Sequence, residues 1–146
     1  MRPLPPLVFL LCLLVMSGLR LCLPGPLFIP WPWALTGLAP LALGLMLTLG
    51  GAGQFRRRDT NIKTFDDPDV LVTDGWFRLS RNPMYLGFVL ALLGVATLLG
   101  AVVPFAVVLL FWVLTDRWYI AFEERAMRRR FGDAYEAYAR RVRRWL

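Results

Sequence analysis

Four long apolar runs, separated by short or basic connections, constrain the fold of this chain more than any other feature. The runs cover about residues 4–23, 33–49, 83–99 and 102–120. Roughly 20 apolar residues in a helix span the hydrocarbon core of a bilayer. The hydrophobic fraction, 58%, also exceeds that of ordinary soluble domains. The sequence therefore predicts an all-α integral membrane protein, a single domain over 1–146 with about four transmembrane helices.

The placement of basic residues predicts the topology. Outside the apolar runs, basic residues occur at Arg2, in the polar loop 54–81 and from Arg117 onward, whereas the connections 24–32 and 99–101 have none. Connections rich in arginine and lysine stay in the cytoplasm. Four spans then place both termini, the loop and the C-terminal tail on the cytoplasmic side.

Composition narrows the function classes. The chain has no histidine, which excludes histidine bases and histidine metal sites. Cys12 and Cys22 both lie in the first apolar run, so we expect neither a disulfide nor a metal site there. The net charge of +7 flanks the apolar runs, which favours membrane lipids over nucleic acid as a partner. Lys63 is the only lysine, and this arginine bias indicates a GC-rich bacterial genome and hence the inner membrane.

The acidic run 66–69 is the one place where a metal site needs to be considered. It holds three aspartates around a proline but lacks the Asp/Asn-Gly-Glu spacing of a calcium loop. We interpret the run as a solvated turn, and we expect no metal.

Proline and glycine mark the expected ends of the helices. Four prolines within 24–32 forbid a continuous helix there, and Gly100 ends the third run, so the third and fourth helices should form a tight hairpin. The glycine-rich run 50–53 is expected to end the second helix, because no strand precedes it to support a nucleotide-binding loop. The first run is interpreted as an uncleaved helix in preference to a signal peptide.

The segment 80–87 joins the polar loop to the third apolar run. Asn82 is a favoured N-cap residue and Pro83 suits the first helical position, so a helix should begin here. Tyr85 lies in its first turn and Arg81 just outside it. The segment is either a simple helix start at the membrane surface or a ligand site at a helix N-terminus.

The cytoplasmic tail, 121–146, is expected to form two short helices. Ile120, Glu124, Met127 and Phe131 share one face of the first, and Gly132 should end it. A carboxylate on an apolar face needs a partner. Glu124 either pairs with the arginine four residues later, Arg128, or accepts a ligand that faces the spans.

The second tail helix is expected to be amphipathic and basic. Its apolar face comprises Tyr135, Tyr138, Val142 and Trp145, and four arginines lie among them at 140, 141, 143 and 144. Such a helix rests on anionic lipid headgroups, although one of its arginines can still turn inward.

Two segments together resemble a known family. Segment 71–87 contains Arg81-Asn82-Pro83 followed by Tyr85 and Gly87, and segment 123–142 contains Glu-Glu, Phe-Gly and two spaced tyrosines. This order is similar to that of the isoprenylcysteine carboxyl methyltransferases and their bacterial relatives, which are related to phospholipid methyltransferases. The resemblance covers about residues 54–146. The sequence departs from the family pattern at three positions: Trp76 for proline, Asn82 for histidine and Met127 for leucine.

The resemblance implies a membrane methyltransferase that uses S-adenosyl-L-methionine and acts on a small or lipidic carboxylate, thiol or amine. It implies a cytoplasmic cofactor pocket closed by the tail, and no metal. It also implies a catalytic pair, Glu124 and Arg141. The cofactor-binding residues that it implies are Arg81, Asn82, Pro83, Tyr85, Leu86, Glu123, Glu124 and Tyr138. Two alternatives remain open at this point: an NADPH-dependent reductase on a related membrane fold, and a small multipass membrane protein without enzymatic activity.

Overall fold

The computed structural model describes residues 4–23, 25–57 and 70–146, and most of these are helical. The all-α prediction and the four apolar helices are confirmed. The aspartate-rich run 66–69 and Lys63 lie outside the described residues. The elements are α1 (Pro5–Cys22), the 3-10 turn η1 (Trp33–Gly37), α2 (Leu38–Arg57), the 3-10 turn η2 (Gly75–Arg78), α3 (Pro83–Leu99), α4 (Val102–Leu114), the π-helical turn η3 (Thr115–Ile120) and α5 (Ala121–Arg141).

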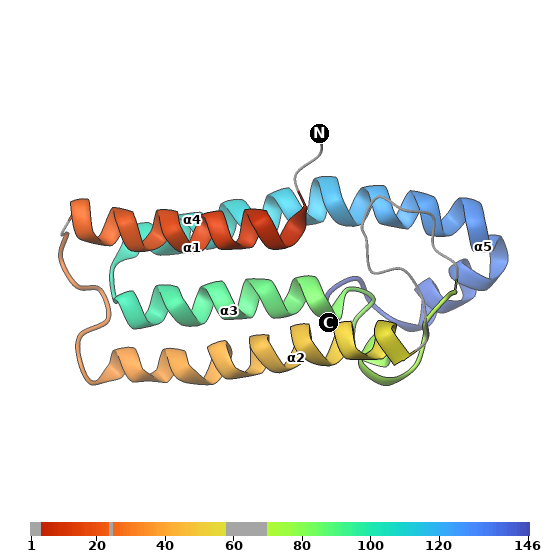
Figure 1. Cartoon of the computed structure of the whole chain (residues 1–146), viewed down its shortest axis with the longest axis horizontal. Helices are drawn as coiled ribbons and strands as arrows, with labels where there is room; N and C mark the ends of the chain where they lie inside the picture. The colour runs from red at the N-terminus through yellow and green to blue at the C-terminus, as the bar shows by residue number, and fades with distance from the viewer. Residues whose placement is uncertain (1–3, 24, 58–69) are drawn as a thin grey trace.

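The helices form an elongated bundle in which α3 lies between α2 and the pair formed by α1 and α4 (Figure 1). The connection between α1 and α2 meets the α3–α4 turn at one end, where the amides of Phe28 and Ile29 donate to the Gly100 carbonyl oxygen at 2.7 and 3.0 Å. At the other end α1 and α3 begin, the C-terminus lies nearby, and α5 projects beyond the bundle (Figure 1). Within the described residues, the polar segment before α3 and the tail after α4 thus gather at one end of the bundle.

Three of the helical stretches are long and apolar enough to cross a membrane: Pro5–Cys22, Trp33–Arg57 and Val102–Arg141. Pro83–Leu99 is a shorter apolar helix between them. Large apolar side chains such as Leu14 and Leu110 lie on the outer faces of α1 and α4, with 71% and 68% of their surface exposed. Apolar surface on this scale fits contact with lipid.

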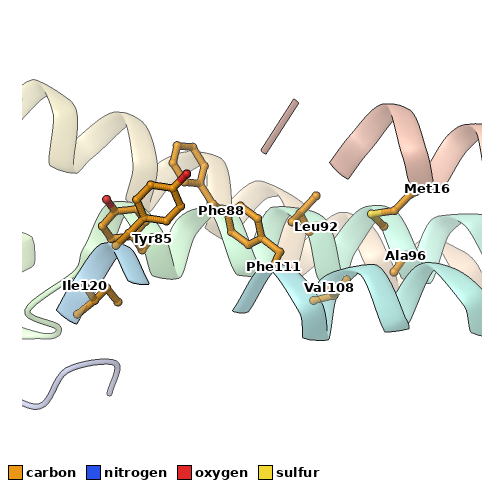
Figure 2. Packing of buried hydrophobic residues seen from close by; sticks show 9 residues of the cluster. Met16, Tyr85, Phe88, Leu92, Ala96, Val108, Phe111 and Ile120 are labelled. Carbon is orange, nitrogen blue, oxygen red and sulfur yellow. The ribbon is translucent and has the colours of Figure 1, made fainter. Parts of the chain in front are cut away.

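The main core lies where α1, α3 and α4 meet (Figure 2). Met16 of α1, Leu92 of α3 and Phe111 of α4 are each at most 1% exposed. The same cluster continues toward the polar end of the bundle through Tyr85 and Ile120 (Figure 2). Tyr85, which the sequence places among the site candidates, is therefore also a core residue.

Glycine allows α2 and α3 to pack at close range. A Cβ added to Gly44 would lie 2.5 Å from the Gly87 carbonyl oxygen and 2.5 Å from the Ala91 amide nitrogen. Gly37, directly before α2, and Gly94 of α3 face each other in the same way. Small residues that bring two helix backbones together are typical of packing within membranes.

The prediction that the glycine run 50–53 ends the second helix is wrong, because α2 continues to Arg57. The glycines serve packing here: the indole ring of Trp76 lies directly against Gly50, and Met84 lies against Gly51. The loop that was expected to begin at residue 54 therefore begins later.

The fourth apolar run and the tail form one helical stretch, from α4 through η3 into α5. Within it only Gly132, with φ of 47°, leaves the helical conformation, so the predicted break between two tail helices is confirmed. The second tail helix ends at Arg141, and the predicted apolar face that reached Trp145 extends too far. Gly100, with φ of 68°, ends α3 as expected, and both Cys12 and Cys22 are free.

Candidate functional site

The start of α3 differs in detail from the expected helix cap. Asn82 occupies the N-cap position and Pro83 begins the helix, as predicted. The Asn82 side chain nevertheless makes no capping hydrogen bond, so that part of the prediction is wrong. Its Nδ2 instead donates to the Arg144 carbonyl oxygen at 3.0 Å, while its own backbone amide donates to Ser80 Oγ at 3.0 Å.

The last residues of the chain, 142–146, lie against this helix start, and we call them the C-terminal strap. The Arg81 amide donates to the Arg143 carbonyl oxygen at 3.0 Å, and Ser80 Oγ donates to the Arg144 carbonyl oxygen at 3.2 Å. Together with Asn82, three consecutive residues of the motif hold the strap by its backbone. The strap places the Arg144 side chain inside the polar end of the bundle.

Glu124 is the centre of the site. Its side chain is only 5% exposed, and its carboxylate accepts from Arg144 Nε at 3.0 Å and Arg144 Nη2 at 2.6 Å. Arg81 Nη1 lies 3.2 Å from the same carboxylate, and the expected pair with Arg128 is present at 3.8 Å. A buried carboxylate is tolerated only when charge and hydrogen bonds satisfy it, and here two forked guanidinium groups do so. The hydrogen bonds to Glu124 raise the pKa of Arg144, which keeps it charged.

Asp116, in the π-helical turn η3, is the second acid of the site. Its carboxylate accepts from Arg144 Nη1 at 3.1 Å and from Trp145 Nε1 at 2.9 Å. The Trp145 ring also lies 6.2 Å from the Trp112 ring. π-helical turns displace side chains from the regular helical register and often occur at functional sites. Arg144 thus joins two carboxylates that come from different parts of one helical stretch.

A second polar contact lies beside the Glu124 cluster. The Tyr85 hydroxyl donates to Glu123 Oε1 at 2.7 Å, which joins the first turn of α3 to the first turn of α5. The Tyr85 ring stacks on Tyr119 with 6.3 Å between the ring centroids. Carboxylate and aromatic groups therefore lie side by side at the end of the apolar core.

The tyrosines of α5 fasten the polar segment before α3. The Tyr138 hydroxyl donates to the Phe77 carbonyl oxygen at 2.7 Å, and Arg81 Nη1 donates to the Tyr135 hydroxyl at 3.2 Å. Burial raises the pKa of both phenols, so they stay neutral donors. Val72, Phe77 and both tyrosine rings form a second apolar cluster, which holds α5 against the helix start.

The structure brings most of the predicted site residues together. Arg81 meets Glu124, Tyr85 meets Glu123, and Asn82 reaches the strap. Pro83 and Leu86 are buried at the start of α3, while the Tyr138 hydroxyl is engaged by backbone. The exception is Arg141, which is exposed and whose Nε donates to the Ala137 carbonyl oxygen at 3.3 Å.

Sequence reasoning missed Arg144 and Asp116 as site residues. The sequence indicated that one of the four tail arginines can turn inward, but not which one. Helical spacing could not identify Arg144, because the helix ends at Arg141. Asp116 lies near the end of the fourth apolar run, 102–120. This place within an apolar run was the available hint, since a charge there needs a partner.

The sequence model of the phospholipid methyltransferase family matches residues 33–134. The chain belongs to this family. The match includes Arg81, Tyr85, Asp116 and both glutamates of the site, but ends before the strap. The strap and Arg144 therefore complete the site of this phospholipid methyltransferase family member from outside the matched region.

Several curated relatives of this family member carry methyltransferase names. A probable protein-S-isoprenylcysteine O-methyltransferase of Oryza sativa subsp. indica is 34% identical over 53% of the chain and 41% of the relative. The protein-S-isoprenylcysteine O-methyltransferase of Schizosaccharomyces pombe is 38% identical over 50% of the chain and 31% of the relative. An uncharacterized protein of Haemophilus influenzae is 38% identical over 43% of the chain and its own full length. The chain thus spans less than half the length of the two named relatives. No solved structure matches it significantly.

Proposed function

We propose that this protein is an S-adenosyl-L-methionine-dependent membrane methyltransferase that acts on a small or lipidic carboxylate, thiol or amine. Family membership supports the reaction class. The observation that carries the proposal is the buried Glu124 carboxylate held by Arg81 and Arg144 where the apolar core ends. In this proposal, the water-soluble cofactor reaches this place from the cytoplasm and the lipidic acceptor reaches it from the bilayer.

The side chains at this place fit the chemistry of the cofactor. Among the described residues, Arg81 Nε is buried without a hydrogen-bond partner, which leaves a donor for a carboxylate. Glu123 and Glu124 offer acceptors for ribose hydroxyls or for an ammonium group.

When bound, the cofactor supplies an electrophilic methyl group, so the protein's task is orientation and charge balance. Arg81 and Arg144 hold the Glu124 carboxylate in one place, and the Tyr85 hydroxyl holds Glu123. The apolar cluster below them keeps water from that side of the site. A carboxylate or thiolate acceptor needs no histidine base, in agreement with the composition of the chain.

The orientation in the membrane is part of the same proposal. Because α1 begins and the chain ends toward the polar end of the bundle, a cytoplasmic site requires both termini in the cytoplasm, here beside a bacterial inner membrane (Figure 1). The basic residues of the tail support this orientation.

Transfer of a labelled methyl group tests the proposal. Membranes that contain the protein should move label from S-adenosyl-L-methionine into a pool of lipid, thiol and amine acceptors. Tyr85→Phe removes only the hydroxyl that donates to Glu123, and should lower the initial rate roughly tenfold, as for a lost hydrogen bond to a charged group.

The exposed Arg140→Gln variant is the matched control and should retain the wild-type rate. Absence of transfer to every acceptor class by folded protein would contradict the proposal. Stabilisation by NADPH alone, with none by S-adenosylhomocysteine, would favour the reductase alternative.

A further inference from the structure

A cleft of about 910 Å³ opens at the end of α2, and none of its lining residues belongs to the Glu124 cluster. One wall is the last two turns of α2 and the other is the turn η2 with the residues on either side of it. The lining residues are Leu49, Gly50, Gly53, Gln54, Arg57, Asp74, Gly75, Trp76, Arg78 and Leu79.

Specific contacts hold the two walls of the cleft in place. Gln54 of α2 donates through Nε2 to the Asp74 carbonyl oxygen at 2.7 Å and accepts from the Trp76 amide at 3.2 Å. The Trp76 indole packs on Gly50, where any side chain would collide with it. Gly75, with φ of 55°, makes the turn that brings Trp76 to this position. The cleft is therefore a fixed feature of the fold.

The cleft changes from apolar to basic along the axis of α2. Leu49 and Arg57 are eight residues apart in one helix, which separates them by about 12 Å. Leu49 and Leu79 are 69% and 59% exposed, so they line the cleft without packing in the core. Arg57 and Arg78 supply positive charge from opposite walls. A ligand that matches this gradient has an apolar part and an anionic head.

The two arginines share the cleft with one described acid, Asp74, whose carboxylate accepts from Gln54 Nε2 at 3.1 Å. Within residues 4–23, 25–57 and 70–146, neither Arg57 nor Arg78 takes part in an ion pair or a side-chain hydrogen bond. Both are exposed. Arg81 and Arg144, by contrast, are paired with carboxylates. Unpaired arginines beside an indole at the end of an apolar helix are suited to the phosphate of a lipid headgroup.

We propose that this cleft binds one anionic phospholipid, with its phosphate at Arg57 and Arg78 and an acyl chain along Leu49 and Leu79. Free phosphate would use only the basic end and would leave the apolar part of the cleft uncovered. A zwitterionic lipid carries a cation that faces the same two arginines, so anionic lipid is favoured. The site is separate from the Glu124 cluster, and its occupancy does not depend on methyl transfer.

Native mass spectrometry of the purified full-length protein tests the site. The protein is equilibrated in detergent with equal amounts of phosphatidylglycerol and phosphatidylcholine, and retained lipid is counted. The wild type should retain phosphatidylglycerol preferentially. Arg57→Gln with Arg78→Gln should reduce this preference at least about fivefold, because each arginine near a membrane surface contributes roughly that factor.

Arg129→Gln with Arg130→Gln is the matched control, because both of these arginines are exposed on α5 outside the cleft. It removes the same charge and should leave the preference unchanged. Equal losses of the lipid preference in the two double variants would show that only the net charge of the protein matters, and this would overturn the site. Displacement of the lipid by inorganic phosphate at equal concentration would also overturn it.

A cavity-filling variant tests the location without changing charge. A Cβ at Gly53 meets no atom within 4 Å, so Gly53→Phe places a ring in the cleft without a backbone collision. It should abolish preferential retention of phosphatidylglycerol. Gly18→Phe on α1 has equally open space and should have no effect. Unchanged retention of phosphatidylglycerol in Gly53→Phe would contradict the lipid site. Methyl transfer by the same variant is a separate measurement and tests only the proposed function.

Discussion

Glu124→Ala should lower the free energy of unfolding by about 3–5 kcal/mol, the range for removal of one partner from a buried ion pair. The loss is large because the variant leaves Arg81 and Arg144 facing each other without the carboxylate that joins them. Arg144 would keep Asp116, but Arg81 would lose its only carboxylate partner among the described residues. Reversible unfolding in detergent, followed by tryptophan fluorescence, measures the difference.

Glu136→Ala is the control for this prediction. Glu136 also pairs with an arginine, at 2.8 Å from Arg128 Nε, but 43% of its side chain is exposed. Exposed pairs contribute at most about 1 kcal/mol. Similar losses in the free energy of unfolding of the two variants would contradict the stabilising role assigned to the buried Glu124 pair.

Gly44→Leu should be the second strongly destabilising substitution, with a loss of about 3 kcal/mol, at the upper end for overpacked interfaces. Its side chain would meet the backbone of α3 at Gly87 and Ala91, and backbone atoms cannot rotate away. The helices α2 and α3 would have to separate, which also moves the start of α3 relative to Gln54 and the η2 turn. The same unfolding assay, with methyl transfer as a second measurement, detects both consequences.

Gly18→Leu offers a matched control in another apolar helix. A Cβ at Gly18 has no atom within 4 Å, and a leucine there would lie on the outer face of α1. It should leave stability within about 0.5 kcal/mol, as for ordinary surface positions. Tolerance of leucine at Gly44 would contradict the close packing of α2 on α3.

The helices were predictable where local chemistry decides them. Apolar length gave all four, and Gly100 and Gly132 were correctly predicted as breaks, since both have positive φ values that favour glycine. The glycines 50–53 were misjudged because their role depends on Trp76 and Met84, which are distant in sequence. In membrane helices, small residues such as glycine are typical of the surfaces where two helices meet.

The site was predictable in part for the same reason. The helical period placed Glu124 on an apolar face, and its pairing with Arg128 followed from the spacing. The stronger partner, Arg144, lies beyond the last helical residue, so no period could assign its direction. Its position is set by hydrogen bonds that the side chains of Ser80 and Asn82, more than sixty residues earlier, donate to its backbone carbonyl oxygen. The role of Arg141 stays a prediction.

Equilibrium binding of S-adenosylhomocysteine by calorimetry is the most direct test of the proposed methyltransferase function. Purified wild-type protein should bind one molecule per chain. Arg81→Gln should weaken binding more than about tenfold, because it removes a buried, charge-assisted donor at the Glu124 cluster. The exposed Arg140→Gln variant should bind as the wild type does. No binding by folded wild-type protein, or equal affinity in Arg81→Gln, would contradict a cofactor site at this cluster.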